Sequence, residues 1–210
     1  MILDEIVAKK EIRLKAIDKV KFKKLPKAEY SKNLFINTFI NNDFTVIGEF
    51  KKASPSKGII LENFQIDKIL EEYEKLPIGA YSVLTEEEYF LGKNEYLQYI
   101  SSNTNKPLLR KDFIIEKYQI NEAAYLGASA VLLIVAVLGD KLKDFYETAM
   151  NLGLAALVEV HNKNELEMAL EIDADIIGIN NRNLKDFTVD LATTRNLLQF
   201  IPKNKIMFVY

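Results

Sequence analysis

Four apolar segments of this chain each end on a charged or amide side chain that suits proton transfer or anion binding. These polar positions are Glu49 with Lys51, then Lys111, Glu159 and Asn180. A carboxylate or a lysine becomes a general acid or base when burial or a neighbouring charge moves its pKa. Repeated at the ends of successive predicted strands, such groups are typical of the rim of a parallel barrel, where barrel enzymes keep their active sites.

The densest polar segment is residues 49–58, Glu-Phe-Lys-Lys-Ala-Ser-Pro-Ser-Lys-Gly. Glu49 stands two residues before Lys51, so its carboxylate can orient the lysine and keep it charged. The Ser-Pro-Ser-Lys-Gly stretch offers hydroxyl and backbone N–H groups to an anion. The same composition also suits a solvated basic turn. The position directly after a predicted strand favours the functional interpretation.

Two further strand ends carry candidate proton-transfer groups. Lys111 stands between Arg110 and Asp112, and it can hold a proton for transfer or belong to a surface salt-bridge cluster. Glu159 stands between two valines, so desolvation is expected to raise its pKa unless the side chain points to solvent. We expect His161 to lie on the opposite face from Glu159, as a loop or cap residue.

The segment 178–184, Gly-Ile-Asn-Asn-Arg-Asn-Leu, ends a predicted strand in amides and an arginine. Arg182 suits a phosphate or a carboxylate, because a guanidinium binds both through paired hydrogen bonds. Turn chemistry is the alternative and is favoured for Asn183, since asparagine tolerates a left-handed backbone. Phe90 and Phe113 could wall a flat aromatic substrate, although ordinary packing explains either ring taken singly.

These positions belong to a repeating pattern of strands and helices. Residues 1–43 have apolar residues at helical spacing and form an extension. From residue 44 onwards, strand-like runs alternate with amphipathic helical segments, which predicts a parallel sheet. Seven strands with continuous helical cover, and no glycine-rich dinucleotide turn, favour a barrel over an open sheet. The predicted strands are 44–49, 78–84, 107–111, 130–135, 154–160, 175–180 and 205–210, and the predicted helices include 66–76, 116–126, 142–152, 163–171 and 191–200.

Composition narrows the class of protein. The chain has 210 residues, 49% of them hydrophobic, and a net charge of -2, which fits a soluble globular protein and argues against a dedicated nucleic-acid binder. It has no cysteine and one histidine, so disulfides, thiolate chemistry and metal sites built from several histidines are not expected. No apolar stretch reaches membrane-spanning length and the N-terminus lacks the features of a secretory signal, so cytoplasm is the expected location.

Taken together, these motifs resemble one known family, indole-3-glycerol phosphate synthase. The resemblance follows the chain in order from its N-terminal helix onwards, and several of its blocks are specific. The segments that carry it are 49–56, Ser-Val-Leu-Thr-Glu at 82–86, Tyr-Phe-x-Gly at 89–92, Leu-Arg-Lys-Asp-Phe-Ile at 109–114, Glu-Ala at 122–123 with Gly-Ala at 127–128, Leu-Leu-Ile at 132–134, Val-Glu-Val at 158–160 and 178–184.

The resemblance implies an α/β fold, the (β/α)8 TIM barrel with an N-terminal helical extension. It implies a carboxy-lyase of tryptophan biosynthesis that uses no cofactor and no metal. Such an enzyme closes the indole ring of 1-(2-carboxyphenylamino)-1-deoxyribulose 5-phosphate and releases carbon dioxide and water. The expected partner is therefore this small phosphorylated substrate, with no nucleic acid and no membrane.

The resemblance also assigns expected roles to residues of the motifs. Lys111 is the expected general acid at the ribulose carbonyl, and Glu159 is the expected base in the dehydration. Lys51, oriented by Glu49, is expected to hold the anionic substrate and to share in proton transfer. The other expected substrate-binding residues are Asn180 and Arg182, which orient oxygens, and Ser54, Phe90, Phe113, Leu132 and Leu184, which line the pocket.

The family pattern continues beyond the seventh strand with a Ser-Glu-Ser-Gly-type motif and an eighth strand with a glycine-rich turn. The present sequence stops near the start of that motif, so we expect helix 7, strand 8 and helix 8 to be lacking. The expected domains are an extension, 1–43, and an incomplete barrel, 44–210. We expect unpaired first and seventh strands and low synthase activity, since the usual phosphate site is missing. An intact barrel is expected to be a monomer, whereas an open one can self-associate.

Three other interpretations stay open. The first is another phosphate-binding barrel enzyme, such as a phosphoribosylanthranilate isomerase, although neither the extension nor the 49–56 segment is expected there. The second is a non-catalytic barrel fragment that self-associates through its open sheet edges. The third is an anion- or RNA-binding domain built on Lys21, Lys23, Lys24 and the 51–57 cluster, which the net charge disfavours.

Overall fold

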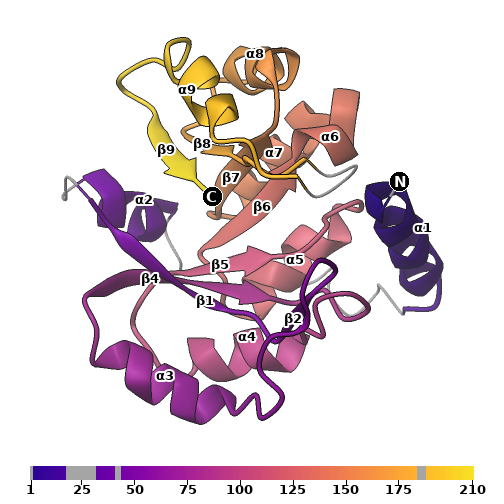
Figure 1. The fold of residues 1–210 in the computed structure, drawn as a ribbon, viewed down its shortest axis with the longest axis vertical. Helices are drawn as coiled ribbons and strands as arrows, with labels where there is room; N and C mark the ends of the chain where they lie inside the picture. Colours follow the sequence, from indigo (N-terminus) through magenta and orange to yellow (C-terminus); the bar gives the residue numbers. More distant parts are fainter. Residues whose placement is uncertain (1, 18–31, 41–43, 184–187) are drawn as a thin grey trace.

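Seven parallel strands form one curled sheet in the computed structural model, which describes residues 2–17, 32–40, 44–183 and 188–210 (Figure 1). The strands pair in the order β1-β4-β5-β6-β7-β8-β9, as expected of repeated βα units. Each of the seven predicted strands is confirmed to within two residues at either end. Their bounds are β1 (Val46–Phe50), β4 (Ile78–Leu84), β5 (Leu108–Lys111), β6 (Ala130–Ile134), β7 (Ala155–Val160), β8 (Ile176–Ile179) and β9 (Ile206–Val209).

Helices cover the outer face of this sheet (Figure 1). The helices named from the sequence are present as α3 (Ile66–Glu74), α5 (Tyr118–Tyr125), α7 (Leu142–Asn151), α8 (Lys163–Glu171) and α9 (Ala192–Leu198), and α4 (Asn94–Ser101) accompanies them. The extension supplies α1 (Ile2–Lys15) and α2 (Lys32–Ile40). Outside the predicted pattern lie a hairpin of β2 (Ala53–Ser54) with β3 (Gly58–Ile59), and the short helix α6 (Val135–Leu138) with a 3-10 turn, Gly139–Lys141.

Alternation along the strands divides the core into two layers. Outward side chains such as Val131 and Leu133 of β6 pack with Ile120 of α5 and other helical residues. Inward side chains such as Leu132 and Leu157 form a second cluster inside the curl of the sheet. The sheet is therefore buried on both faces, as its near-continuous apolar strands predict.

Helix α2 covers the end of the sheet at which the strands begin. Phe35 is fully buried there, with its ring centroid 6.2 Å from that of Phe208 on β9. Phe39 lies 4.8 Å from the same ring in an edge-on arrangement. Since Phe35 joins inward side chains of several strands, the extension contributes directly to the interior of the sheet.

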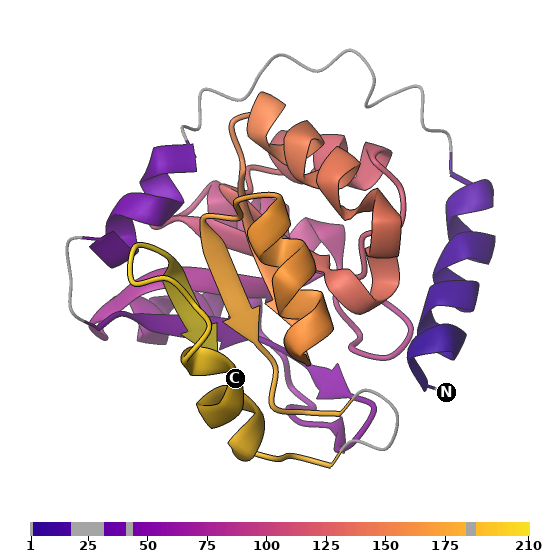
Figure 2. The same ribbon diagram turned by 90° about the horizontal axis from the view of Figure 1, so that it is seen from above.

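Helix α1 lies on the opposite side of the molecule from α2 (Figure 2). Its Lys10 is buried, and Lys10 Nζ lies 2.6 Å from Asp112 Oδ1, just beyond β5. Arg13 forms an ion pair with Glu87 in the loop after β4. These contacts hold α1 against the loops that follow the strand ends. None of the described helices is both long and apolar enough to cross a membrane.

Strands β1 and β9 are the two ends of the sheet, and no other described strand pairs with their outer edges. Apolar side chains are exposed along both edges, since Phe44, Val46, Met207 and Val209 are each at least 40% exposed. A cavity of about 800 Å³ lies between the two edges and is lined by these residues. The described chain thus forms an open curled sheet.

Candidate active site

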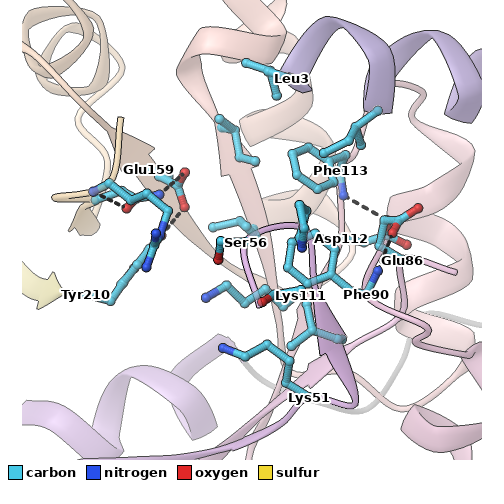
Figure 3. Close-up of a pocket in the computed structure, with 18 of the residues that line it drawn as sticks. Leu3, Lys51, Ser56, Glu86, Phe90, Lys111, Asp112, Phe113, Glu159 and Tyr210 are labelled. Carbon is cyan, nitrogen blue, oxygen red and sulfur yellow. Dashed lines mark hydrogen bonds between the residues drawn. The ribbon is translucent and has the colours of Figure 1, made fainter. Parts of the chain in front are cut away.

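A cavity of about 380 Å³ opens at the end of the sheet where the strands finish (Figure 3). Every predicted site residue within the described part of the chain lines it, whereas Leu184 lies outside the described residues. The structure thus brings these side chains together, while their catalytic and binding roles stay predictions. They are Glu49, Lys51, Ser54, Phe90, Lys111, Phe113, Leu132, Glu159, Asn180 and Arg182.

Strand alternation explains how the polar groups reach this cavity. Along β7, Ala155 and Leu157 belong to the inward cluster, and Glu159 is the next residue on the same face. On β5, Lys111 follows the inward Leu109 in the same way. The inward faces of β5 and β7 are therefore apolar in the middle and polar at the C-terminal end.

Glu49 lies between two lysines. Its Oε1 accepts a hydrogen bond from Lys51 Nζ, and its Oε2 accepts one from Lys111 Nζ at 3.1 Å. Burial alone would raise the pKa of Glu49, but the charges of Lys111 and Lys51 outweigh burial and hold that pKa below its ordinary range. The ionised carboxylate thus fixes both ammonium groups at the cavity wall. Figure 3 shows these two amino groups directed toward Glu159 and Tyr210.

Glu159 is almost fully buried on the facing strand, β7. Asn180 Nδ2 donates to its Oε1 at 3.1 Å, and the Tyr210 hydroxyl donates to its Oε2. The expectation of a raised pKa is wrong. Burial does act to raise the pKa of Glu159, but contacts with His161 and Tyr210 outweigh burial and lower it. The carboxylate is therefore ionised at neutral pH, the state that a general base requires.

The expected face of His161 is also wrong, although its place in the loop between β7 and α8 is confirmed. Its Nε2 lies 3.2 Å from Glu159 Oε1, so the two side chains share a face. Residues two positions apart in an extended chain point to the same side, and the spacing of Glu159 and His161 was therefore a usable signal in the sequence.

Tyr210 is a second side chain of the site that the sequence did not single out. Lys111 Nζ lies 4.4 Å from the centroid of its ring, a cation–π contact. Burial and the neighbouring Glu159 raise the pKa of Tyr210 well above its ordinary value, so its phenol stays a hydrogen-bond donor. Gly178 leaves room for the ring, because an added Cβ would lie 3.3 Å from the Tyr210 hydroxyl oxygen. The signal was the apolar run of β9, which ends on Tyr210 as other strands end on their polar residues.

Phe90 and Phe113 form an aromatic wall of the cavity (Figure 3). Their ring centroids are 6.2 Å apart, and their planes are tilted by 41°. The backbone N–H of Phe90 donates to the buried carboxylate of Glu86 at 3.0 Å, which fixes this loop. Gly92 is required in the same loop, since a Cβ there would lie 2.3 Å from the Leu84 carbonyl oxygen.

The hairpin β2–β3 forms another part of the wall. Ser54 pairs with Gly58 across the turn, and Gly58 has a φ of +63°, a left-handed conformation that suits glycine. Ser56 and Lys57 of the turn line the cavity beside Ser54. Residues 56–58 at the tip of this basic segment are exposed, as in a solvated turn. The segment nevertheless belongs to the site, because its side chains line the cavity.

Asn180 connects the base to the loop after β8. Its Nδ2 holds Glu159, and its Oδ1 accepts the backbone N–H of Arg182 at 2.9 Å. Arg182 also forms an isolated antiparallel bridge with Val189. The orientation of the Asn180 amide is thus fixed by Glu159 on one side and by the Arg182 backbone on the other.

The N-terminal helix completes the cavity. Leu3 and Ile6 of α1 line it, and Figure 3 shows Leu3 beyond Phe113. The helical spacing of these residues predicted a helix. It did not indicate which strand ends this helix would cover, because the contacts join parts of the chain far apart in sequence.

Fold and site together define a class, that of parallel α/β-barrel proteins with an acid–base cavity at the C-terminal ends of the strands. Within the described ranges of the chain, no group of three or more histidine, cysteine, aspartate or glutamate side chains is placed to hold a metal ion.

Comparison with known proteins is more specific. The chain matches the family described as indole-3-glycerol phosphate synthase over residues 3–209. It is 51% identical over 210 residues to the indole-3-glycerol phosphate synthase of Thermoanaerobacter pseudethanolicus, covering 97% of this chain and 80% of that protein. The synthase of Clostridium kluyveri is 49% identical over 97% of this chain and 80% of its own length. The chain belongs to the indole-3-glycerol phosphate synthase family.

The fold is shared more widely. A solved dihydropteroate synthase from Xanthomonas albilineans, in complex with 7,8-dihydropteroate, has a TM-score of 0.52 at 13% identity, covering 79% of this chain and 71% of that one. This likeness concerns the fold alone. Family membership confirms the predicted TIM-barrel class and the assignment as a carboxy-lyase of tryptophan biosynthesis. Lys21, Lys23 and Lys24, on which the RNA-binding interpretation rests, lie outside the described residues.

Proposed function

We propose that this protein closes the indole ring of 1-(2-carboxyphenylamino)-1-deoxyribulose 5-phosphate, with Lys111 as general acid and Glu159 as general base. The observation that carries the proposal is that the Glu49–Lys51–Lys111 cluster and the buried Glu159 line one cavity. A substrate with a carboxylate, a phosphate and a reacting carbonyl needs cations, an acid and an opposing base held in place.

In the first step, the aromatic carbon that bears the carboxylate attacks the ribulose carbonyl carbon. Lys111 gives a proton to the carbonyl oxygen as the carbon–carbon bond forms, and the carboxylate leaves as carbon dioxide. The ion pair with Glu49 holds Lys111 in place, while its side chain stays 23% exposed and can reach a ligand. A positioned acid of this kind contributes roughly 10²–10⁴-fold to the rate.

In the second step, the new hydroxyl takes a proton from the Lys51 ammonium and leaves as water, while Glu159 takes a proton from the neighbouring carbon. Glu159 suits this role because it is ionised and its two oxygens are held by Asn180 and Tyr210. Lys51 shares Glu49 with Lys111, so it holds the anionic substrate and takes part in proton transfer.

The remaining roles concern the fit of the substrate. The aromatic ring is proposed to lie against Phe90 and Phe113, and Asn180 and Arg182 to orient substrate oxygens. The other proposed pocket residues are Ser54, Leu132 and Leu184. We also propose residues 1–43 as an extension, residues 44–210 as the barrel, and the cytoplasm as the place of this biosynthetic reaction.

A further βα unit is proposed to fill the gap between β1 and β9 in the active enzyme, as helix 7, strand 8 and helix 8 of the complete fold. The exposed apolar edges support this, because one strand between them would pair both. The gap is also lined by Glu49, Lys111 and Tyr210, so a filling strand would border the site and could carry the phosphate-binding groups.

The same edges favour a second property, which is self-association of the 210-residue chain. Val46 on β1 and Met207 and Val209 on β9 present apolar side chains beside backbone groups that no other described strand pairs. Pairing between copies would cover both. Native mass spectrometry tests this, and a monomer at all accessible concentrations would contradict it.

An assay of indoleglycerol phosphate formation tests the proposed function. It compares the 210-residue chain with an extended chain, in which the part of the Thermoanaerobacter protein that follows the matched region is joined after Tyr210. We expect turnover by the extended chain and at least about 100-fold slower turnover by the short one. A folded extended chain without turnover would overturn the function, and equal rates would overturn the need for a further βα unit.

A further inference from the structure

The chain has one histidine, and its imidazole lies between two carboxylates. His161 Nδ1 is 3.0 Å from Glu165 Oε2 on α8, and His161 Nε2 is 3.2 Å from Glu159 Oε1 on β7. The His161 side chain is only 14% exposed. One side of the ring therefore faces the proposed base, and the other faces an acid outside the proposed machinery.

Glu165 is held rigidly by the start of helix α8. Asn162 caps this helix, because its Oδ1 accepts the backbone N–H of Glu165 at 3.0 Å. In return the Glu165 carboxylate accepts from Asn162 Nδ2 at 2.6 Å and from the His161 backbone N–H at 2.8 Å. This reciprocal arrangement is similar to a capping box, except that Glu165 accepts the backbone N–H of the residue before the N-cap. It leaves Glu165 Oε2 fixed beside His161 Nδ1, so the acid selects the ring orientation.

The other ring nitrogen has no hydrogen-bond partner in the described structure. His161 Nε2 is buried, yet its contact with Glu159 lacks hydrogen-bond alignment despite the short distance. A buried polar atom without a partner is costly. The 3.2 Å distance to Glu159 Oε1 leaves this carboxylate as the acceptor nearest to hand for Nε2.

We infer that Glu165 and His161 form a relay that orients the Glu159 carboxylate and keeps it ionised, which makes them positioning residues for the dehydration step. This inference rests on the proposed role of Glu159 as the base. Glu165 fixes Nδ1–H, and the imidazolium directs Nε2–H at Glu159. His161 itself stays beside the base and does not touch the reacting atoms.

The balance of charge around the ring supports the relay. Burial acts to lower the pKa of His161, but the close carboxylates of Glu159 and Glu165 outweigh burial and raise the pKa to about 9. An imidazolium between the two acids offsets the cost of burying Glu159 as an anion. The other charged side chains that line the crevice beside His161 are Asp4 of α1 and, after β8, Arg182 and Asp190.

A role confined to capping α8 is the alternative. Such a role needs the backbone N–H of His161 and the Glu165 carboxylate, but it does not need Glu159. The two interpretations therefore differ in one measurable respect, which is whether the protonation of His161 and the protonation of Glu159 depend on each other.

Proton NMR titration of the single histidine tests the inference in the 210-residue chain, because its ring signals are unique. The variants are Glu159→Gln and Glu165→Gln, which keep side-chain size and an acceptor oxygen. The matched control is Glu167→Gln, since Glu167 is 58% exposed on the same helix. We expect the His161 pKa to lie near 9 in the parent chain, to fall by at least about one unit in both variants, and to stay unchanged in the control.

Carbon NMR of the Glu159 carboxyl in His161→Gln provides the reciprocal measurement, with Glu159→Gln identifying the signal. We expect the Glu159 pKa to rise when His161 is replaced. A His161 pKa that is indifferent to Glu159→Gln, with a Glu159 pKa indifferent to His161→Gln, would overturn the relay. Neither readout needs turnover, so a folded extended chain without turnover would overturn the proposed function and leave this test intact.

Discussion

Arg110 and Lys111 are neighbours on β5, yet their side chains enter two ionic clusters of different character. The outer cluster, whose side chains are at most 7% exposed, consists of Lys10, Arg110, Asp112 and Glu122. The inner cluster, whose side chains are 23–33% exposed, consists of Glu49, Lys51 and Lys111. Because adjacent residues of a strand point to opposite faces, one short segment supplies both clusters.

The outer cluster uses its hydrogen-bonding capacity within the protein. Arg110 donates to Thr85 Oγ1 at 3.0 Å and to Glu122 Oε2 at 2.7 Å. Asp112 accepts from Thr85 at 2.7 Å and lies 2.6 Å from Lys10 Nζ. Burial acts to raise the pKa of Asp112, but the charges of Lys10 and Arg110 outweigh burial and lower it. A buried, hydrogen-bonded network of this kind connects α1, β5 and α5.

The inner cluster has two cations for one carboxylate, so one positive charge is left within it for an anionic ligand. Its ammonium groups stay partly solvated and can exchange water for substrate. The comparison indicates what separates structural from functional use of the same residue types. Saturated, buried pairs hold elements together, whereas partly exposed pairs with surplus charge are available for chemistry.

Replacing Lys111 tests whether the inner cluster serves catalysis and not stability. In the extended chain, Lys111→Ala is expected to lower kcat roughly 10²–10⁴-fold, because the proposed acid is lost. Its stability is expected to change by less than about 1 kcal/mol, since the pair is partly solvated. Steady-state kinetics and urea unfolding measure the two quantities.

Lys117→Ala is a matched control, because Lys117 pairs with Asp144 on the exposed surface, and its kcat should stay within about twofold. If Lys111→Ala kept most of kcat while Lys51→Ala abolished it, the acid would be Lys51 instead.

Replacing Asp112 tests whether the outer cluster stabilises the fold. Asp112→Ala leaves Lys10 and Arg110 buried with less compensating charge, so the free energy of unfolding should fall by roughly 3–5 kcal/mol. Urea unfolding followed by circular dichroism measures the change. A loss below about 1 kcal/mol would show that the outer cluster is not structural in this sense.

These two clusters also mark how far the sequence could be interpreted. The strands were predictable because apolar runs of suitable length alternate with helical periodicity. Glu49, Lys111 and Glu159 were predictable as site residues because each ends such a run. The buried cluster that Arg110 and Asp112 join was not predictable, because it includes Lys10, which is about a hundred residues away in the chain.

Other features escaped prediction for similar reasons. Leu3 and Ile6 reach the cavity only because α1 docks over the strand ends. Tyr210 was not predicted because the other strand ends of the site carry charged or amide groups, whereas this one carries an aromatic ring. The pKa of Glu159 was expected to rise with burial, and it falls because His161 and Tyr210 contact the carboxylate, which no local pattern reveals.

His161 combines features of the two regions, because it lies beside the active-site cavity but is largely buried, like the outer cluster. The pH dependence of stability measures what this buried charge contributes to the fold. The pKa of His161 is raised from 6.5 to about 9 in the folded chain. Protonated His161 therefore stabilises the folded chain fully below pH 6.5. This stabilisation, on the order of 3 kcal/mol, is lost as the pH rises through about 9. Urea unfolding at stepped pH measures this loss, and His161→Gln should flatten it. Parallel curves for the two chains would contradict the assignment.

The smallest expected effect concerns Glu49, the carboxylate at the centre of the inner cluster. Glu49→Gln leaves two lysines without their shared anion, but both side chains are 23–33% exposed, so water can solvate them. The free energy of unfolding should therefore change by no more than about 1 kcal/mol at neutral pH. The lowered pKa of Glu49 implies that this small contribution disappears as the pH falls through that pKa, because the carboxylate is then protonated. Urea unfolding at pH 7 and at pH 3 measures both. A loss as large as that of Asp112→Ala would mean that exposure does not separate the two clusters, and that the inner one also holds the fold together.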